Sequence, residues 1–315
     1  MTRMRAAVCT GWGPPEVVRV LDVKQPSPGK GQVRIRVVAS SVTASETMMR
    51  GLKFPRPYRI LVRIMFGLRP PGRPLILGIV FSGEVESVGR KVTAFKPGDE
   101  VFGLSQWKGG CNAEYVCVSA TGLIAARPAN LSHAEAAALP YGGLLASVLV
   151  RKAAIKAGQR VLVYGASGAI GTATVQLARH LGARVTGVCS TTNLALVQSL
   201  GAESVVDYTR EDFTASGERY DAILDAVGKR KSAPAMVHAE RALAPGGTIM
   251  SIDDFRPWLS AEDLLVLKRL AESGEFRPVV DRTFALDQIA EAHRYVDEGH
   301  KRGNVIVTIA GSRVT

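Results

Sequence analysis

One glycine-rich stretch has residue types and a spacing that can do recognisable chemistry. It reads GASGAIG and follows the apolar run 161–164. In a turn between a strand and a helix, residues this small let the backbone approach a pyrophosphate, whose charge meets the free N–H groups at the start of the helix. The alternative is a tight turn without a ligand. The stretch predicts a dinucleotide-binding turn formed by Gly165, Ala166, Ser167, Gly168, Ala169, Ile170 and Gly171.

The residues after the next expected strand, 184–189, bear on which dinucleotide is bound. A carboxylate at this point holds the ribose 2′-hydroxyl of NAD, and the chain instead reads STTN over 190–193. Uncharged donors accept a 2′-phosphate without repulsion, although no Arg or Lys stands beside the serine. We therefore expect NADP(H) to be preferred over NAD(H), with an ordinary polar loop as the alternative. The predicted contacts are Ser190, Thr192, Asn193, Tyr208 and Val227.

Alternating strands and helices must position these residues. We expect strands at 161–164, 184–189, 204–208, 221–226 and 247–252, and helices at 169–181, 194–200, 232–243 and 261–273. This alternation requires right-handed crossovers and a parallel sheet covered on both faces, which is a doubly wound α/β fold. The N-terminal part reads as short strands between Gly/Pro turns and predicts a compact β domain, with strands at 16–23, 32–42, 82–89, 99–104 and 113–118. A helix at 286–299 and a strand at 304–309 end the sequence.

Composition narrows the class of protein. Hydrophobic residues make up 46% and charged residues 22% of the 315, which is typical of a globular protein. No apolar run approaches the roughly 20 residues that cross a bilayer, and the start MTRMRAAVCTGWG has no export signal, so we expect a cytoplasmic protein. The four cysteines are scattered without CxxC spacing, which indicates neither a disulfide framework nor a zinc cluster.

The formal charge of +12 favours anionic partners, and much of it is local. Residues 47–83 contain no Asp or Glu and are rich in apolar and aromatic side chains. This basic segment could lie on anionic lipid or nucleic acid, whereas a solvated basic loop is the simpler interpretation. Its cations are Arg50, Lys53, Arg56, Arg59, Arg63, Arg69 and Arg73.

Six strings in this order resemble the medium-chain dehydrogenase/reductase superfamily, and within it the zinc-independent quinone oxidoreductases. They are GEVESVG with FKPGDEVFG, EAAALPYGG, the stretch 165–213, YDAILDAVG and HKRGNVIVTI. The resemblance implies a GroES-like substrate domain over 1–126, completed by 276–315, and a Rossmann domain over 127–275. It also implies a cleft between the domains with the nicotinamide at its floor.

Departures from the zinc-dependent relatives bear on the reaction. Ile79 and Val80 stand where those relatives carry polar residues, so we expect no metal. Without a Lewis acid, the reaction implied is hydride delivery from NADPH to a quinone or an α,β-unsaturated carbonyl, small and hydrophobic. A cofactor-binding protein with little turnover, acting through its basic surface, is the alternative.

The catalytic residue is unknown from the sequence. Where relatives have Asn-Pro followed by an acid, the chain reads TASE, so Thr43 replaces the amide and Glu46 keeps the acid, while Leu145 replaces a usual threonine. Both replacements remove polar groups expected near the nicotinamide. Thr43 and Tyr58 are the only proton-donor candidates, and a structural role is the simpler interpretation for each.

The linker after the fifth expected strand predicts the state of assembly. Only DDFRPWLS joins 252 to 261, with Pro257 inside it. Such a segment has no room for a crossover and another strand, and proline cannot donate to a ladder. We expect a five-stranded sheet lacking the sixth, edge strand, and a monomer or a dimer formed through another surface.

Overall fold

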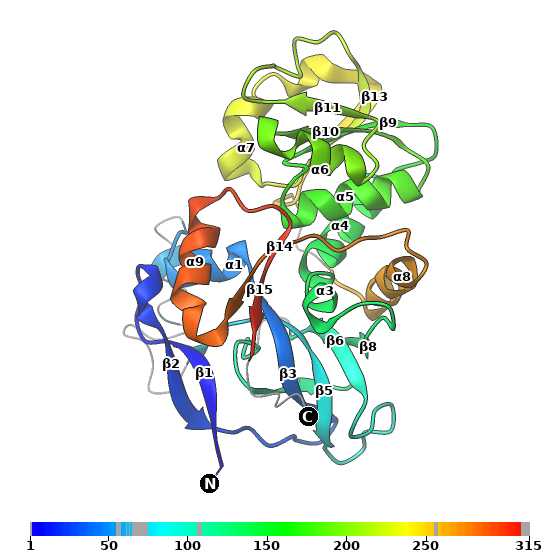
Figure 1. Cartoon of the computed structure of the whole chain (residues 1–315). Coiled ribbons are helices and arrows are strands. Elements are labelled where there is room, and N and C mark those ends of the chain that lie inside the picture. Colours follow the sequence, from blue (N-terminus) through cyan, green and yellow to red (C-terminus); the bar gives the residue numbers. More distant parts are fainter. Residues whose placement is uncertain are drawn as a thin grey trace. The chain divides into compact units, whose positions relative to one another are not determined.

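The computed structural model describes residues 2–54, 58–60, 62, 64, 75–105, 109–254 and 258–309, and the chain forms two compact units (Figure 1). Unit 1 comprises Met1–Pro140 and Val280–Thr315, and unit 2 comprises Tyr141–Val279. These units are defined by contacts alone, so the domain limits given above stay a prediction. Across the described ranges, no helix combines the length and the apolar character needed to cross a lipid bilayer.

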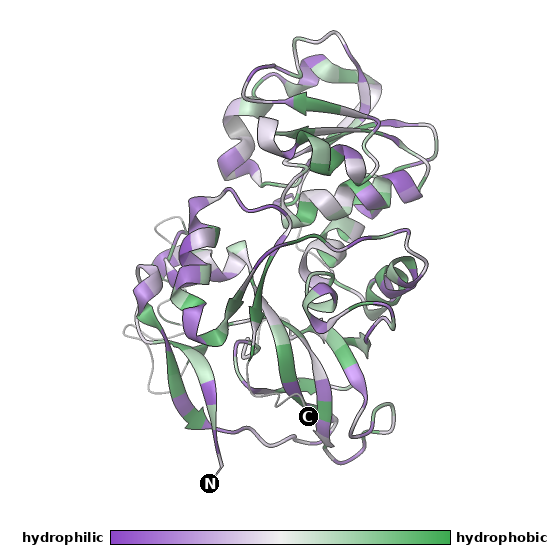
Figure 2. Cartoon of the chain, viewed as in Figure 1, coloured by the Kyte–Doolittle hydropathy of each residue, from purple (hydrophilic) through white to green (hydrophobic). Residues whose placement is uncertain are grey.

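Unit 2 is built on one parallel sheet. Its strands are β9 (Arg160–Tyr164), β10 (Arg184–Cys189), β11 (Ser204–Asp207), β12 (Tyr220–Asp225) and β13 (Leu243–Ser251), in the order β11-β10-β9-β12-β13. The middle of β9, Val161 to Val163, is fully buried, as expected for a sheet covered on both faces, and Figure 2 colours β10 and β11 of this sheet largely as hydrophobic. The predicted doubly wound fold is confirmed.

Helices connect these strands. The helix α5 (Ala169–His180) joins β9 to β10, and η3 (Thr191–Asn193) with α6 (Leu194–Ser199) joins β10 to β11. Because these two connections run in one direction along the sheet and the β12–β13 connection runs in the other, right-handed crossovers put them on opposite faces. The direction reverses between β9 and β12, and ligands of such sheets bind at the carboxyl ends of the strands there.

The connection between β12 and β13 differs in detail from the prediction, whereas the number of strands agrees with it. The helix expected at 232–243 is divided into α7 (Lys229–Met236) and η4 (Ala239–Ala242); Pro234 inside α7 removes a helical hydrogen bond. The sheet has five strands, as predicted, and within the described ranges the next element after β13 is α8 (Ala261–Glu272). The helix α4 (Pro140–Lys152) packs closely on α8, since Gly143 leaves no room for a side chain beside Leu267.

Unit 1 is a β structure that both ends of the chain complete. One sheet has the order β2-β1-β4, and a second has the order β14-β15-β3-β5-β6-β8, with β7 also paired to β3. The strands are β1 (Arg3–Cys9), β2 (Val18–Lys24), β3 (Gln32–Val42), β4 (Leu75–Ile76), β5 (Val80–Val88), β6 (Glu100–Leu104), β7 (Tyr115–Ser119), β8 (Leu123–Ala126), β14 (Val280–Ala285) and β15 (Asn304–Thr308). The last strand, β15, pairs antiparallel with β3 and so belongs to the fold of the N-terminal part.

Short helices cover these strands. They are η1 (Pro15–Val17), α1 (Ala44–Arg50), α3 (His133–Ala137), η5 (Leu286–Gln288) and α9 (Ile289–Glu298). The apolar face of α9, with Ile289, Ala292 and Val296, packs into the same core as Val33 and Ile35 of β3. The C-terminal segment therefore supplies part of the core of unit 1 as well as a strand.

Candidate functional site

The glycine turn lies at the carboxyl end of β9, where the predicted site requires it. Gly165 has a φ of +76°, and its N–H and that of Ala166 donate to the Val188 carbonyl at 3.1 and 3.0 Å. A Cβ on Gly165 would lie 2.2 Å from Val227 Cγ2, and a Cβ on Gly171 would lie 2.0 Å from the Gly165 carbonyl oxygen. Close packing of strand, turn and helix therefore requires glycine at both positions and places Val227 against the turn.

The start of α5 is suited to an anion. Gly168 is its N-cap without a side-chain cap, and its first turn, with Ala169 and Ile170, contains no acidic residue. The first N–H groups of a helix have no intrahelical partner, and the helix dipole gives that end a partial positive charge. A Cβ on Gly168 would have nothing nearer than 3.6 Å, so this position is open. The free N–H groups and partial positive charge of this glycine cradle suit a pyrophosphate.

A buried amide links this turn to the tip of β10. Asn193 is 7% exposed, and its Nδ2 donates to Ser190 Oγ at 3.0 Å and to Ser167 Oγ at 3.3 Å. Its Oδ1 is buried and has no hydrogen-bond partner among the described residues. The structure thus brings together three predicted residues from two loops, whereas Thr192 is exposed beside them.

The end of β11 adds charged groups that sequence reasoning missed. Asp207 is buried and accepts hydrogen bonds from the Thr191 hydroxyl and from the N–H and hydroxyl of Thr209, at 3.0 and 2.7 Å for the latter two. These bonds, that of Thr191 foremost, lower the pKa of Asp207. Arg210 lies 3.7 Å from this carboxylate with a largely exposed side chain. In the sequence, only the position of Arg210 just after the third expected strand could have indicated a role for it.

Tyr208 is the remaining predicted cofactor contact. It is half exposed, and its side chain packs beside another aromatic ring, apart from the serines. Its ring lies 6.4 Å from that of Tyr164, which in turn lies 6.2 Å from Phe213. These three aromatic rings border a hollow of about 200 Å³ that also meets His238. The phenol is therefore accessible at the carboxyl end of the sheet.

In unit 1, the proton-donor candidate Thr43 is joined to a buried acid. Thr43 caps α1: its hydroxyl accepts from the Glu46 N–H at 3.4 Å and donates to Glu46 Oε1 at 3.2 Å. Asn112 Nδ2 donates to Glu46 Oε2 at 3.3 Å, and the N–H of Ile79 also bonds to this carboxylate. Burial nevertheless raises the pKa of Glu46 to about 7. The other candidate, Tyr58, is 59% exposed.

The stretch expected to lack metal ligands is apolar. Val80 is fully buried, and Ile79 is half-buried. Across the part of the chain that the structure describes, no three His, Cys, Asp or Glu side chains gather in a group that could hold a metal ion. The buried thiol of Cys111 lies near Glu46, and burial raises its pKa to about 12, so it stays protonated at neutral pH.

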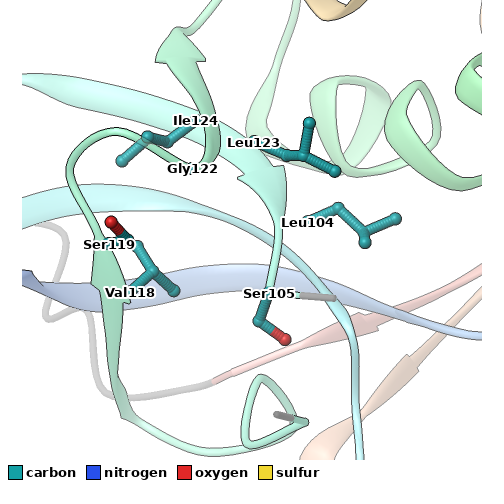
Figure 3. A pocket seen from close by; sticks show the side chains of 7 residues that line it. All are labelled: Leu104, Ser105, Val118, Ser119, Gly122, Leu123 and Ile124. Carbon is teal, nitrogen blue, oxygen red and sulfur yellow. The ribbon is translucent and has the colours of Figure 1, made fainter. Parts of the chain in front are cut away.

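A second hollow, in unit 1, is too small for a substrate. Figure 3 shows it between β6, β7 and β8, bordered by Leu104, Ser105, Val118, Ser119, Gly122, Leu123 and Ile124. Its volume is about 70 Å³, whereas ligand pockets usually hold several hundred.

The basic segment 47–83 is only partly described. Arg56, Arg63, Arg69 and Arg73 lie outside the described residues, so a role of this surface stays a prediction. Arg50 is fully buried: it pairs with Asp297 of α9 and donates to the Gly13 carbonyl at 3.1 Å. Lys53 Nζ lies 2.6 Å from the same carboxylate. Arg50 therefore links α1 to α9 and adds no charge to a surface.

Comparison with known proteins matches both units. The family model for the alcohol dehydrogenase GroES-like domain matches residues 29–129, and two models for zinc-binding dehydrogenases match residues 169–256 and 253–307. The 2-methylene-furan-3-one reductase of Solanum lycopersicum is 31% identical over 320 residues, covering 97% of this chain and 79% of that protein. The chloroplastic NADPH-dependent alkenal/one oxidoreductase of Arabidopsis thaliana is 30% identical over 325 residues, with 96% and 79% covered.

A solved structure is similar over the whole chain. The quinone oxidoreductase from Coxiella burnetii has a TM-score of 0.83 and 27% sequence identity, and the match covers 98% of this chain and 100% of that one.

Proposed function

The chain belongs to the medium-chain dehydrogenase/reductase superfamily as a quinone oxidoreductase-like NAD(P)H-dependent oxidoreductase, and we propose that it is an NADPH-dependent reductase of quinones or α,β-unsaturated carbonyls. The observation that carries this proposal is the glycine cradle at the start of α5, joined to Ser190 through Asn193. The names of the similar proteins, an enone reductase, an alkenal/one oxidoreductase and a quinone oxidoreductase, support the substrate class.

The residues of unit 2 fit the proposed cofactor. The N–H groups at the start of α5 would bind its pyrophosphate, with Gly165 and Gly171 allowing the close approach. Ser190 and Thr192 would face the ribose that carries the 2′-phosphate, with Asn193 bonded to Ser190. Tyr208 would contact the cofactor from the end of β11, and Val227 from its place against the glycine turn. Arg210, which lies 3.7 Å from Asp207, supplies a cation at the same edge of the sheet, and residues 190–193 themselves carry no carboxylate to repel a phosphate. These features favour NADPH over NADH.

The proposed reaction requires a hydride, a proton and a bound acceptor. The cofactor supplies the hydride, and the protein orients it and limits the access of water. Thr43 and Glu46 are the proposed holders of the proton: the Thr43 hydroxyl shares its hydrogen with Glu46 Oε1, and this carboxyl is half protonated near neutral pH. Ile79 and Val80 offer no metal ligand, which supports a reaction without zinc.

Cofactor binding and turnover should be measured together to test the proposal. We expect the protein to bind NADPH more tightly than NADH and to consume NADPH steadily with a panel of ortho-quinones and enones. Turnover with saturated ketones or simple alcohols alone would contradict the proposed substrate class. Tight NADPH binding without turnover on any acceptor would favour the alternative of a cofactor-binding protein. Failure to bind either nucleotide would overturn both.

A further inference from the structure

The Asn193 amide is unusual in its hydrogen bonding. This residue is 7% exposed, and its side-chain N–H groups donate to two serine hydroxyls from different loops. These are Ser190 at the tip of β10 and Ser167 in the glycine turn. The Oδ1 of Asn193 is buried without a partner among the described residues. A buried acceptor left without a donor costs free energy, and the opposite orientation would instead leave the amide N–H groups at that place without an acceptor. What distinguishes the two orientations is therefore the role that each gives to the two serine hydroxyls.

The orientation of the amide decides which way the serine hydroxyls point their hydrogens. A hydroxyl has one donor and two acceptor sites. While Ser190 Oγ accepts from Asn193 Nδ2, its own hydrogen is available to a ligand, and the same holds for Ser167 Oγ. With the amide turned over, each hydroxyl would donate to Oδ1 and would offer a ligand only lone pairs. Both serines are half-buried, so they can be reached from outside while the amide is shielded.

A 2′-phosphate and a ribose 2′-hydroxyl require opposite orientations of the serine hydroxyls. A phosphate ester has mostly acceptor oxygens, so it requires donors, whereas a ribose 2′-hydroxyl can donate to a serine that presents a lone pair. The observed orientation is the one that suits a phosphate.

We propose that Asn193 is a positioning residue for cofactor choice, which holds the Ser190 and Ser167 hydroxyls as donors toward the phosphate groups of NADPH. The inference rests on the proposed cofactor and goes beyond it, because it assigns preference for the 2′-phosphate to a side chain that acts through Ser190. A purely structural Asn193, which only joins the two loops, would affect both nucleotides equally.

A double-mutant cycle on binding tests this directly. Dissociation constants for NADPH and NADH are measured by titration for the native protein, Asn193→Leu, Ser190→Ala and the double variant. Each single change should lower the preference for NADPH over NADH about tenfold, as expected for loss of one hydrogen bond to a charged group. The double variant should show no further loss beyond about twofold, since Asn193 acts through the hydroxyl that is already gone.

A matched control and clear contrary outcomes complete the experiment. Gln198→Leu removes an exposed amide from α6 and should leave both dissociation constants unchanged. If Asn193→Leu does not fold, Asn193→Ala takes its place in the cycle. Losses that multiply in the double variant, or an equal loss for both nucleotides, would overturn the positioning role while leaving the proposed function intact. A native protein that binds neither nucleotide would overturn both.

Discussion

At the scale of single residues, Glu46 is a buried carboxyl group whose charge is not offset by any cation among the described residues. Its partners are the Thr43 hydroxyl, the Asn112 amide and the Ile79 N–H, all of which favour the charged form, yet burial outweighs them and raises its pKa to about 7. Such an acid changes its charge within the range in which enzymes operate, which is typical of groups that hold a proton for a reaction. It also makes the stability of unit 1 depend on pH.

We expect the free energy of unfolding to fall as pH rises through this range because of Glu46. Its pKa is near 4.5 when unfolded and about 7 when folded, so the folded state binds more protons between these values. The stabilisation is fully present below pH 4.5 and is lost as pH passes 7, a change on the order of 3 kcal/mol. Urea unfolding at several pH values should show that Glu46→Gln flattens this slope, while Glu262→Gln, at an exposed position, does not. An unchanged slope in Glu46→Gln would contradict the pKa.

Ser190 permits a residue-scale test of cofactor preference. Substituting Asp for Ser190 introduces a carboxylate at the tip of β10, where it would repel a 2′-phosphate and accept a ribose hydroxyl. We expect NADPH binding to weaken by about 1 to 3 kcal/mol while NADH binding is kept or improves. Titrating both nucleotides at one ionic strength measures this, and equal weakening of the two would argue against a phosphate at this place.

At the scale of elements, the β9–α5 turn depends on how closely its parts pack. Gly165 has a left-handed backbone, and the carbonyl of that residue lies where a side chain on Gly171 would be. The same close contacts therefore form the anion-binding turn and pack the helix on the strand. A change that separates helix from strand should affect stability and nucleotide binding together.

Gly171→Ala should disrupt this turn. The new Cβ would meet backbone 2.0 Å away, so the helix or the turn must shift, at a cost of about 1 to 3 kcal/mol of stability and with weaker NADPH binding. Gly168→Ala is the matched control for stability, because its φ of −78° suits alanine and its Cβ would have 3.6 Å of clearance. Thermal unfolding should separate the two variants, and equal melting temperatures would contradict the tight packing.

The ion pair between α1 and α9 is a second element-scale feature. Arg50 is fully buried and pairs with Asp297, which Lys53 also contacts. Asp297→Asn would leave the guanidinium buried without a counter-charge, so we expect a loss of about 3 to 5 kcal/mol in the unfolding free energy. Lys53→Met removes a partly exposed partner and should cost less than about 1 kcal/mol. Similar losses of unfolding free energy in the two variants would show that the burial of Arg50 does not determine the energetic effect of this ion pair.

At the scale of the whole molecule, the five-stranded sheet bears on assembly. The last strand of the order, β13, pairs on one side with β12, and the described ranges contain no strand on its other side. An open edge invites pairing with another chain, and Ile249 on it is partly exposed. Because only residues 252–260 join β13 to α8, we predict no further strand there and therefore no pairing of sixth strands.

We therefore expect a monomer, or a dimer formed through another surface. Light scattering on the eluting protein gives the mass, and small-angle scattering gives the shape of any dimer. A monomer, or a dimer whose scattering does not fit a continuous sheet, agrees with this expectation. A stable dimer that only pairing of sheet edges fits would refute it.

The sequence by itself determined the elements whose signals are local. The glycine turn, the strand β3 at 32–42 and the alternation of five strands with helices were predicted because spacing and period are properties of neighbouring residues. The strands β1, β4, β8 and β14 were missed. The strands β4 and β8 are only two and four residues long, and β14 at the sheet edge carries Asp281 and Arg282 in a polar run.

Only the tertiary structure decided how distant residues combine. The Asn193 bond to Ser167 joins two loops, the Asn112 bond to Glu46 joins residues 66 apart, and the Arg50 bond to Asp297 joins residues 247 apart. Each pairs polar groups whose partner no local pattern indicates, and burial gives each pair its energetic weight. In unit 1 burial is set by strands from both ends of the chain, and in unit 2 by loops that follow different strands, which no window of sequence contains.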